Sequence, residues 1–237
     1  MHAVVVAGGK GVRLRPFTTS LPKPLVPIGD ELPIIEIVIR QLRLCGFTHL
    51  TIAVGHLGHI IRAYVDDGSQ WGIDVSYAME DAPLGTAGPV VRLAETLPEH
   101  FLVMNGDVLT DMDFAAFLED HVDADAPLTV ATCRRRVTTD FGVIELDGDR
   151  LTGFLEKPVV EHDVSMGIYA LARRTLLPYE KGKPLGFDQL LLDLLARGVH
   201  PRAYRYGGYW LDIGRPDDYE RANEDFPRLR HTLLADE

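Results

Sequence analysis

Cysteine and long apolar runs are scarce in this sequence, and each scarcity excludes a class of protein. Cys45 and Cys133 are the only cysteines among 237 residues, so at most one disulfide can form; this excludes a disulfide-stapled scaffold, and we expect both thiols to be reduced. No apolar run approaches the roughly 18 residues of a membrane span. The first apolar run ends in Gly-Gly instead of at a signal-peptide cleavage site. We therefore expect a cytoplasmic protein.

Basic residues are also in deficit, except at one end of the chain. The 24 lysines and arginines against 35 acidic residues give a formal net charge of −11, which argues against nucleic acid or an anionic membrane as a partner. Before Asp30, however, no residue is acidic, while Lys10, Arg13, Arg15 and Lys23 are basic. This glycine-rich basic segment predicts a small phosphorylated ligand; a solvated basic loop is the alternative.

The composition that is present, 46% hydrophobic and 25% charged, is that of a globular protein with one sizeable core. Strand and helix patterns alternate along the first half. We expect strands at 3–7, 49–54, 73–79 and 101–105, and helices at 33–45, 57–65 and 85–97. This alternation predicts the α/β class: a doubly wound, Rossmann-like mixed β-sheet flanked by helices.

The second half is richer in strands. Strands are expected at 128–134, 141–146, 151–156 and 164–170, with a hairpin turn at Asp147-Gly148-Asp149. Helices are expected to start at Phe114 and to span 187–196 and 216–225. After about Phe226 we expect only a short tail. No linker or internal repeat divides the chain, so one domain over residues 1–237 is predicted.

The segment Gly8-Gly9-Lys10-Gly11-Val12-Arg13-Leu14 directly follows the first predicted strand. Glycines in this place can present backbone N–H groups to a nucleotide without interference from Cβ atoms. A dinucleotide fingerprint would need a glycine at position 14, and a Walker A loop would need Lys-Ser or Lys-Thr after Gly11. Neither is present, so this is neither a standard NAD site nor a P-loop.

Seven short motifs carry a family resemblance, in the family's order. They are AGGKGVRLRPFT with LPKPLVPI at 7–28, PLGTAG at 83–88, NGD at 105–107, FGVI at 141–144, EKP at 156–158, MGIY at 166–169 and WLDIG at 210–214. Together they resemble the sugar-1-phosphate nucleotidylyltransferases, or nucleotide-sugar pyrophosphorylases, over nearly the whole chain. The look is closest to the mannose-1-phosphate and manno-heptose-1-phosphate guanylyltransferases. Val12 departs from the pattern, since the family usually has threonine there.

The resemblance implies an enzyme that converts an NTP and a sugar 1-phosphate to an NDP-sugar and pyrophosphate. It divides the domain into a nucleotide-binding half, about 1–110, and a sugar-phosphate-binding half, about 111–226. A phosphate oxygen is already anionic near neutral pH, because the second pKa of a monoester is about 6, so no strong general base is needed. Alignment and charge neutralisation are expected to supply the catalysis.

The resemblance also assigns roles by position. Arg13 would hold the leaving pyrophosphate and Lys23 the α-phosphate, as the catalytic pair. The nucleotide-binding residues would be Ala7, Gly8, Gly9, Gly11, Glu80, Gly85, Thr86 and Asp107. The sugar-phosphate-binding residues would be Gly142, Glu156, Lys157 and Gly167. Asp107 and Asp212 would hold Mg²⁺, the expected cofactor, which prefers carboxylate and phosphate oxygens; for either aspartate alone, a helix N-cap is the alternative.

Two other groups of residues suggest different chemistry. Asp111-Met112-Asp113 matches the Asp-x-Asp metal motif of many glycosyltransferases, but we favour a capping role at the helix that starts at Phe114. His56 and His59 are spaced for one helix face; without a further ligand nearby, a surface location is preferred.

Glu80 bears on the choice of nucleotide. A carboxylate only accepts hydrogen bonds, and guanine offers two adjacent donors where uracil and thymine offer one. GTP and a mannose-type sugar are therefore favoured, with uridylyl or thymidylyl transfer to another sugar 1-phosphate as the alternative. A non-catalytic regulatory homologue is the alternative of another class. The sequence ends about 25 residues after Asp212, so no C-terminal β-helix is expected; the oligomeric state, with a homodimer among the options, stays open.

Overall fold

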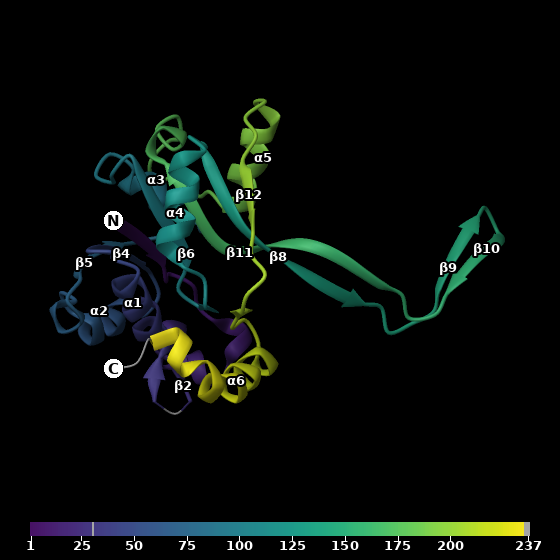
Figure 1. Cartoon of the computed structure of the whole chain (residues 1–237), viewed down its shortest axis with the longest axis horizontal. Coiled ribbons are helices and arrows are strands. Elements are labelled where there is room, and N and C mark those ends of the chain that lie inside the picture. The colour runs from purple at the N-terminus through teal and green to yellow at the C-terminus, as the bar shows by residue number, and fades with distance from the viewer. Residues whose placement is uncertain (30, 235–237) are drawn as a thin grey trace.

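Short apolar runs form the centre of the fold. In the computed structural model, which describes residues 1–29 and 31–234, the parallel strands β1 (His2–Val6), β4 (His49–Val54), β5 (Asp74–Met79) and β6 (His100–Asn105) lie side by side. The full seven-stranded sheet has the order β12-β8-β11-β6-β1-β4-β5, and β11 is antiparallel to both of its neighbours. The predicted mixed, doubly wound sheet is confirmed (Figure 1).

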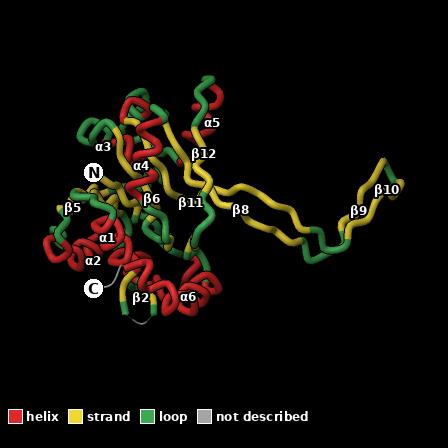
Figure 2. The backbone as a smooth tube through the Cα atoms, viewed as in Figure 1, coloured by secondary structure: helices red, strands yellow, loops and turns green. Residues whose placement is uncertain are grey.

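Helices cover both faces of this sheet, as the apolar spacing of each requires. One buried cluster contains side chains of α1 (Ile34–Leu44), α2 (Gly58–Val65) and α4 (Phe114–Asp123). A second cluster contains side chains of α3 (Gly88–Leu93) and α5 (Phe187–Ala196). The winding of the tube around the sheet can be followed in Figure 2.

A smaller third layer completes the edge where the parallel strands end. Strand β7 (Val108–Thr110) pairs antiparallel with β13 (Trp210–Asp212), which places Asp212 opposite Val108. The short pair β2 (Pro27–Ile28) and β3 (Leu32–Pro33) packs there with α6 (Pro216–Leu234). The C-terminal part of the chain is thereby brought to the end of β6.

A long two-stranded ribbon leaves the sheet. It is formed by β8 (Leu128–Thr138) and β11 (Val159–Ala172), paired out to Thr138 and Val159; at its far end lies the hairpin of β9 (Val143–Asp147) and β10 (Arg150–Leu155). We call residues 134–164 the arm. Figure 1 shows the arm extending away from the sheet and its helices, which we call the body. Its side chains are largely exposed, Phe141 by 77%.

Several predicted boundaries are wrong, and tertiary contacts explain the differences. The helix expected at 216–225 continues to Leu234, because Phe226, Leu229 and Leu233 are buried at helical spacing. The expected tail is therefore helical up to Leu234, and its residues 235–237 lie outside the described residues.

The helix expected at 85–97 spans only Gly88–Leu93. The residues expected to start the helix are not helical, because Gly85 has a φ of +77°. This segment instead contacts the chain before α5, where the Leu185 N–H donates to the Leu84 carbonyl. The strands expected at 128–134 and 164–170 are longer because they continue into the arm. Strands β7 and β12 (Arg202–Arg205) were not expected.

Smaller expectations concern the cysteines and the hairpin. Cys45 and Cys133 are free thiols, half-buried and buried respectively. The expected turn at residues 147–149 joins β9 to β10, with Gly148 at a φ of +60°. Within the described part of the chain, no helix combines the length and apolar character that crossing a membrane requires.

Candidate active site

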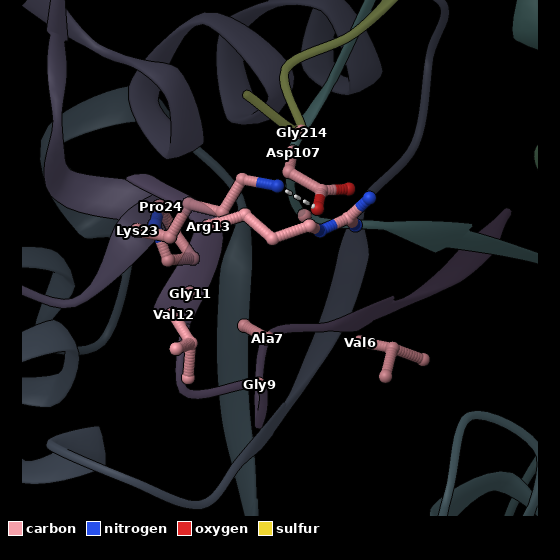
Figure 3. A pocket seen from close by; sticks show the side chains of 11 residues that line it. Val6, Ala7, Gly9, Gly11, Val12, Arg13, Lys23, Pro24, Asp107 and Gly214 are labelled. Atoms are coloured by element: carbon pink, nitrogen blue, oxygen red, sulfur yellow. Dashed lines mark hydrogen bonds and ion pairs between the residues drawn. The ribbon is translucent and has the colours of Figure 1, made fainter. Parts of the chain in front are cut away.

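A cavity of about 230 Å³ lies where β1 and β6 end and the glycine-rich segment begins. The carboxyl ends of parallel strands are where open α/β sheets bind ligands. Six of the residues assigned from the sequence line it: Ala7, Gly9, Gly11, Arg13, Lys23 and Asp107. Figure 3 shows the side chains of Arg13 and Lys23 extending toward Asp107 across this space.

The glycine-rich segment is shaped by Gly11. Its φ of +58° is a left-handed conformation that side chains rarely adopt. A Cβ atom here would lie 3.0 Å from Thr18 Cγ2 and 3.2 Å from Lys23 Cβ. Thr18 Oγ1 donates to the Gly11 carbonyl at 2.6 Å and fixes this turn. By contrast, nothing lies within 4 Å of a Cβ built on Gly9, so a ligand has room to approach the backbone there.

Two cations converge on the cavity. Lys23 is only 8% exposed, and its Nζ lies 2.5 Å from Asp107 Oδ2. Arg13 lies flat against Gly214: the position of a Cβ on Gly214 would be 3.5 Å from Arg13 Cζ and from both Nη atoms. The guanidinium therefore packs directly on the backbone of Gly214, at van der Waals distance from the position of a Cβ.

Asp107 and Asp212 form an interacting carboxylate pair. The Ile213 N–H donates to the Asp107 carbonyl at 3.0 Å, which holds the two chain segments together. The pKa of Asp212 is raised, first by burial and then by the charge of Asp107, while Lys23 and Arg13 oppose the shift. Asp107 Oδ1 is buried without a hydrogen-bond partner.

These two carboxylates fit a divalent cation that takes its remaining ligands from elsewhere. Among the described residues, no group of three or more His, Cys, Asp or Glu side chains could hold a metal. A cation here would have two protein carboxylates, one of them with an unused buried oxygen, and would complete its shell with water and substrate oxygens. Mg²⁺ is bound in this way at many phosphate sites.

Glu80 follows β5 and lies beside the glycine-rich segment. Its Oε2 is 3.1 Å from where a Cβ of Gly8 would lie, so a side chain at position 8 would press on the Glu80 carboxylate. Burial raises the pKa of the Glu80 carboxyl, and its Oε1 is buried without a partner. The carboxylate thus keeps unused acceptor capacity next to the loop.

Gly85 and Thr86 lie outside this cavity. A Cβ on Gly85 would be 2.5 Å from the Leu185 carbonyl oxygen. Thr86 Oγ1 accepts a hydrogen bond from the Phe187 N–H at 3.0 Å. In this structure both residues therefore hold the segment before α5 in place.

The residues assigned to the sugar phosphate are divided between two places. Gly142, Glu156 and Lys157 are on the arm, at the base of its hairpin, and none of them lines a cavity with Arg13. Gly167 is on the body: a Cβ there would be 2.6 Å from Asn105 Nδ2, two residues before Asp107. The structure brings only Gly167 of this set to the strand ends.

The two aspartates of the Asp-x-Asp motif form hydrogen bonds within the protein. Asp113 Oδ1 accepts hydrogen bonds from the N–H groups of Ala115 and Ala116 at 2.9 and 3.0 Å, which confirms the helix cap. Asp111 Oδ1 accepts from the Tyr206 hydroxyl at 2.5 Å and the Tyr209 N–H at 2.6 Å. His56 and His59 are exposed, as expected.

Sequence reasoning missed a second cavity, of about 570 Å³, which shares Arg13 and Gly214 with the first. Asp212 lines it, together with Arg135, Arg136, Arg215 and Arg221. The run Arg134-Arg135-Arg136 in an acidic chain was an available signal, but it lies in a strand and has no motif spacing.

Comparison with known proteins assigns the chain to a family. Residues 2–228 match the family described as nucleotidyl transferase. A mannose-1-phosphate guanylyltransferase of Mycobacterium tuberculosis (strain ATCC 25618 / H37Rv) is 32% identical over 96% of this chain. A UTP–glucose-1-phosphate uridylyltransferase of Synechocystis sp. (strain ATCC 27184 / PCC 6803 / Kazusa) is 31% identical over 94% of it. The chain spans 65% and 62% of the lengths of these two relatives.

A solved structure has a similar fold over nearly its whole length. HddC from Yersinia pseudotuberculosis superposes with a TM-score of 0.74 at 25% identity, covering 95% of this chain and 99% of that one. The same protein has been solved in complex with GMP-PN, with the same score and coverage.

Proposed function

Because the chain belongs to the nucleotidyl transferase family, we propose that it transfers a nucleoside monophosphate from an NTP to a sugar 1-phosphate and releases pyrophosphate. The observation that carries this proposal is the convergence of Arg13, Lys23 and Asp107 beside an open glycine-rich backbone. The names of the two relatives, a guanylyltransferase and a uridylyltransferase acting on sugar 1-phosphates, support the reaction class.

The charges of the site suit this reaction once a divalent cation is bound. Arg13 and Lys23 balance Asp107 and Asp212, so these four side chains alone have no net charge with which to attract a triphosphate. Mg²⁺ at the two aspartates would supply two positive charges and stabilise the charge that develops between the nucleotide and sugar phosphates. Lys23, released from Asp107, would then be available to the α-phosphate.

The protein side chains align the reactants and bind the leaving group. The sugar phosphate is its own nucleophile, since its second pKa is about 6. Its oxygen attacks the α-phosphorus in line, the bond from that phosphorus to the bridging oxygen breaks, and pyrophosphate leaves toward Arg13. The planar guanidinium can contact several phosphate oxygens at once.

GTP is the proposed nucleotide and a mannose-type sugar 1-phosphate the proposed acceptor. The unused acceptor atom of Glu80 beside Gly8 suits the two adjacent donors of guanine. The M. tuberculosis relative is named for GTP and mannose chemistry. UTP remains the second candidate, favoured by the name of the Synechocystis relative.

The test is pyrophosphate release with and without Mg²⁺, crossing GTP, UTP, dTTP, ATP and CTP with several sugar 1-phosphates. We expect release that requires both substrates and the metal, with GTP preferred. Preference for UTP or dTTP would refute the role assigned to Glu80. No release with any pair would refute the reaction and favour a regulatory homologue.

A further inference from the structure

We infer that the arginine-lined cavity beside Asp212 binds the phosphate of the acceptor substrate, and that Arg135 is the residue that orients it. This inference deepens the proposed function and rests on it. Three of the four residues that the family motif assigns to the sugar phosphate, Gly142, Glu156 and Lys157, lie on the arm near its hairpin, whereas Arg135 lies where the arm joins the body.

The location of the cavity is the first argument. It shares Arg13 and Gly214 with the cavity of Lys23 and Asp107, so a ligand in one lies next to a ligand in the other. Attack on an α-phosphorus requires the acceptor phosphate to lie directly beside the nucleotide phosphates. The second cavity, of about 570 Å³, has space for a sugar phosphate at that position.

Its charge is the second argument. Five arginines and two aspartates line it, on a chain whose net charge is −11. Two of these arginines have carboxylate partners, since Arg136 pairs with Glu161 at 2.8 Å and Arg221 with Asp225 at 3.6 Å. Within residues 1–29 and 31–234, Arg135 and Arg215 form no ion pair with a carboxylate. Cations left without an acidic partner in a cavity indicate an anionic ligand.

The fixed position of Arg135 is the third argument. Its guanidinium carbon lies 4.7 Å from the centre of a Trp210 ring, and its Nη2 donates to the Trp210 carbonyl at 3.2 Å. Trp210 is itself held by a hydrogen bond from its Nε1 to the Met166 carbonyl at 2.9 Å. Side chains two residues apart in a strand point to the same face, so Trp210 places Arg135 on the Asp212 side of β13.

Lys157 is further away along the arm. Arg135 is paired with His162, and β11 begins at Val159, three strand steps further out and two residues after Lys157. At about 3.3 Å per strand residue, Val159 lies roughly 10 Å further out along the ribbon than His162, and Lys157 precedes Val159 at the base of the hairpin. In this conformation, Arg135 is therefore the cation that a phosphate next to Asp212 would meet.

The experiment compares Arg135→Gln with Arg134→Gln. Arg134 is the adjacent strand residue; it pairs with Asp163 at 3.2 Å and, unlike Arg135, does not line the cavity. Binding of mannose 1-phosphate, glucose 1-phosphate and inorganic phosphate is measured by calorimetry with Mg²⁺ and a non-hydrolysable GTP analogue. KM for each substrate is measured in parallel, and thermal unfolding checks that each variant folds.

We expect Arg135→Gln to weaken phosphate and sugar-phosphate binding about 10- to 100-fold, the range for a charged hydrogen bond, and to raise the acceptor KM while the GTP KM stays within about twofold. Arg134→Gln should leave both unchanged. Arg135→Lys keeps the positive charge but loses the planar guanidinium, so its affinity for the phosphate should lie between those of the wild type and Arg135→Gln. This variant keeps the test valid if the glutamine variant fails to fold.

The outcomes separate this inference from the proposed function. If the wild type turns over and Arg135→Gln has an unchanged acceptor KM, the inference is wrong and the proposed function stands. If the wild type releases no pyrophosphate but binds inorganic phosphate through Arg135, the site stands and the proposed function is wrong. A wild type that neither turns over nor binds a phosphate overturns both.

Discussion

The cavity of Lys23 and Asp107 and the arm are built from opposite kinds of contact. The cavity is closed by residues far apart in the sequence: Lys23 pairs with Asp107, and Arg13 packs on Gly214. The arm is held by a local ladder between β8 and β11 and by the hairpin beyond it, with exposed side chains such as Leu146, 64% accessible. A change in the cavity should therefore affect folding and ligand binding together, while a change at the exposed hairpin of β9 and β10, at the tip of the arm, should affect neither strongly.

The strongest test of this comparison is Asp107→Asn. The substitution keeps the size of the side chain and removes the charge that pairs with Lys23 and that would hold the metal. We expect turnover to fall by about 10³-fold or more, and the unfolding temperature to fall as well, because a buried Lys23 loses its partner.

The readouts for Asp107→Asn are steady-state pyrophosphate release and calorimetric unfolding. Asp149→Asn, at the tip of the arm, is the matched control and should change neither the rate of pyrophosphate release nor the unfolding temperature. Near-wild-type turnover of the Asp107 variant would remove this aspartate from the site.

Acid provides a second test, because the body contains a buried histidine. His121 is fully buried, and burial, then the charge of His100, lowers its pKa from 6.5 to about 4. Between these two pH values, His121 is protonated in the unfolded chain and neutral in the folded chain. Stability from this residue is complete above pH 6.5 and is lost as the pH falls toward 4, by up to about 3 kcal/mol.

Urea unfolding at a series of pH values measures the His121 effect. His121→Gln should lower stability at pH 7, since the contact with Thr129 Oγ1 at 2.8 Å is altered, but should flatten the decline between pH 6.5 and 4. If the wild type and the variant decline in parallel, His121 is not the residue responsible.

The smallest expected effect compares two glycines with nearly the same backbone. Gly11 and Gly148 have φ values of +58° and +60°, so alanine at either costs about 1–2 kcal/mol of conformational free energy. At Gly11 a Cβ would also crowd Thr18 and Lys23, whereas at Gly148 nothing lies within 4 Å. Gly11→Ala should cost about 1 kcal/mol more and weaken GTP binding; Gly148→Ala should leave binding unchanged.

Chemical denaturation and GTP titration of the two glycine variants give the comparison directly. Equal losses of stability together with equal GTP affinities would mean that the crowding around Gly11 has no consequence, and that the glycine-rich segment is as tolerant as the arm.

Local patterns carried much of the fold prediction. Strand β4 and helix α5 were predicted to the residue, because their apolar spacing is regular and glycine or polar residues border them. The cap at Asp113 followed from residue type alone. The end of α6 was missed, because Pro227 and a polar composition hide a helix whose burial depends on its packing against the rest of the body.

The residues of the candidate site likewise fall into those that local motifs predict and those that only the tertiary structure reveals. The glycine-rich segment, Lys23 and Asp107 could be assigned from motifs, and the structure gathers them in one cavity. Arg135 and Gly214 could not, because their place depends on the pairing of β7 with β13, about a hundred residues apart in the chain. Nor could the position of Lys157, which depends on the direction the arm takes as it leaves the sheet.

The packing of Arg13 on Gly214 has a consequence for synthesis of the protein. Translation delivers the glycine-rich segment first and Gly214, which completes its cavity, almost last. A ribosome-bound chain that has exposed β1 through β12 therefore still lacks the surface on which the Arg13 guanidinium rests. The lining of this cavity is complete only once β13 has paired with β7 and Gly214 lies against Arg13. A translation product halted before that point would lack Gly214 and the buried side chains of α6, and could not complete this cavity.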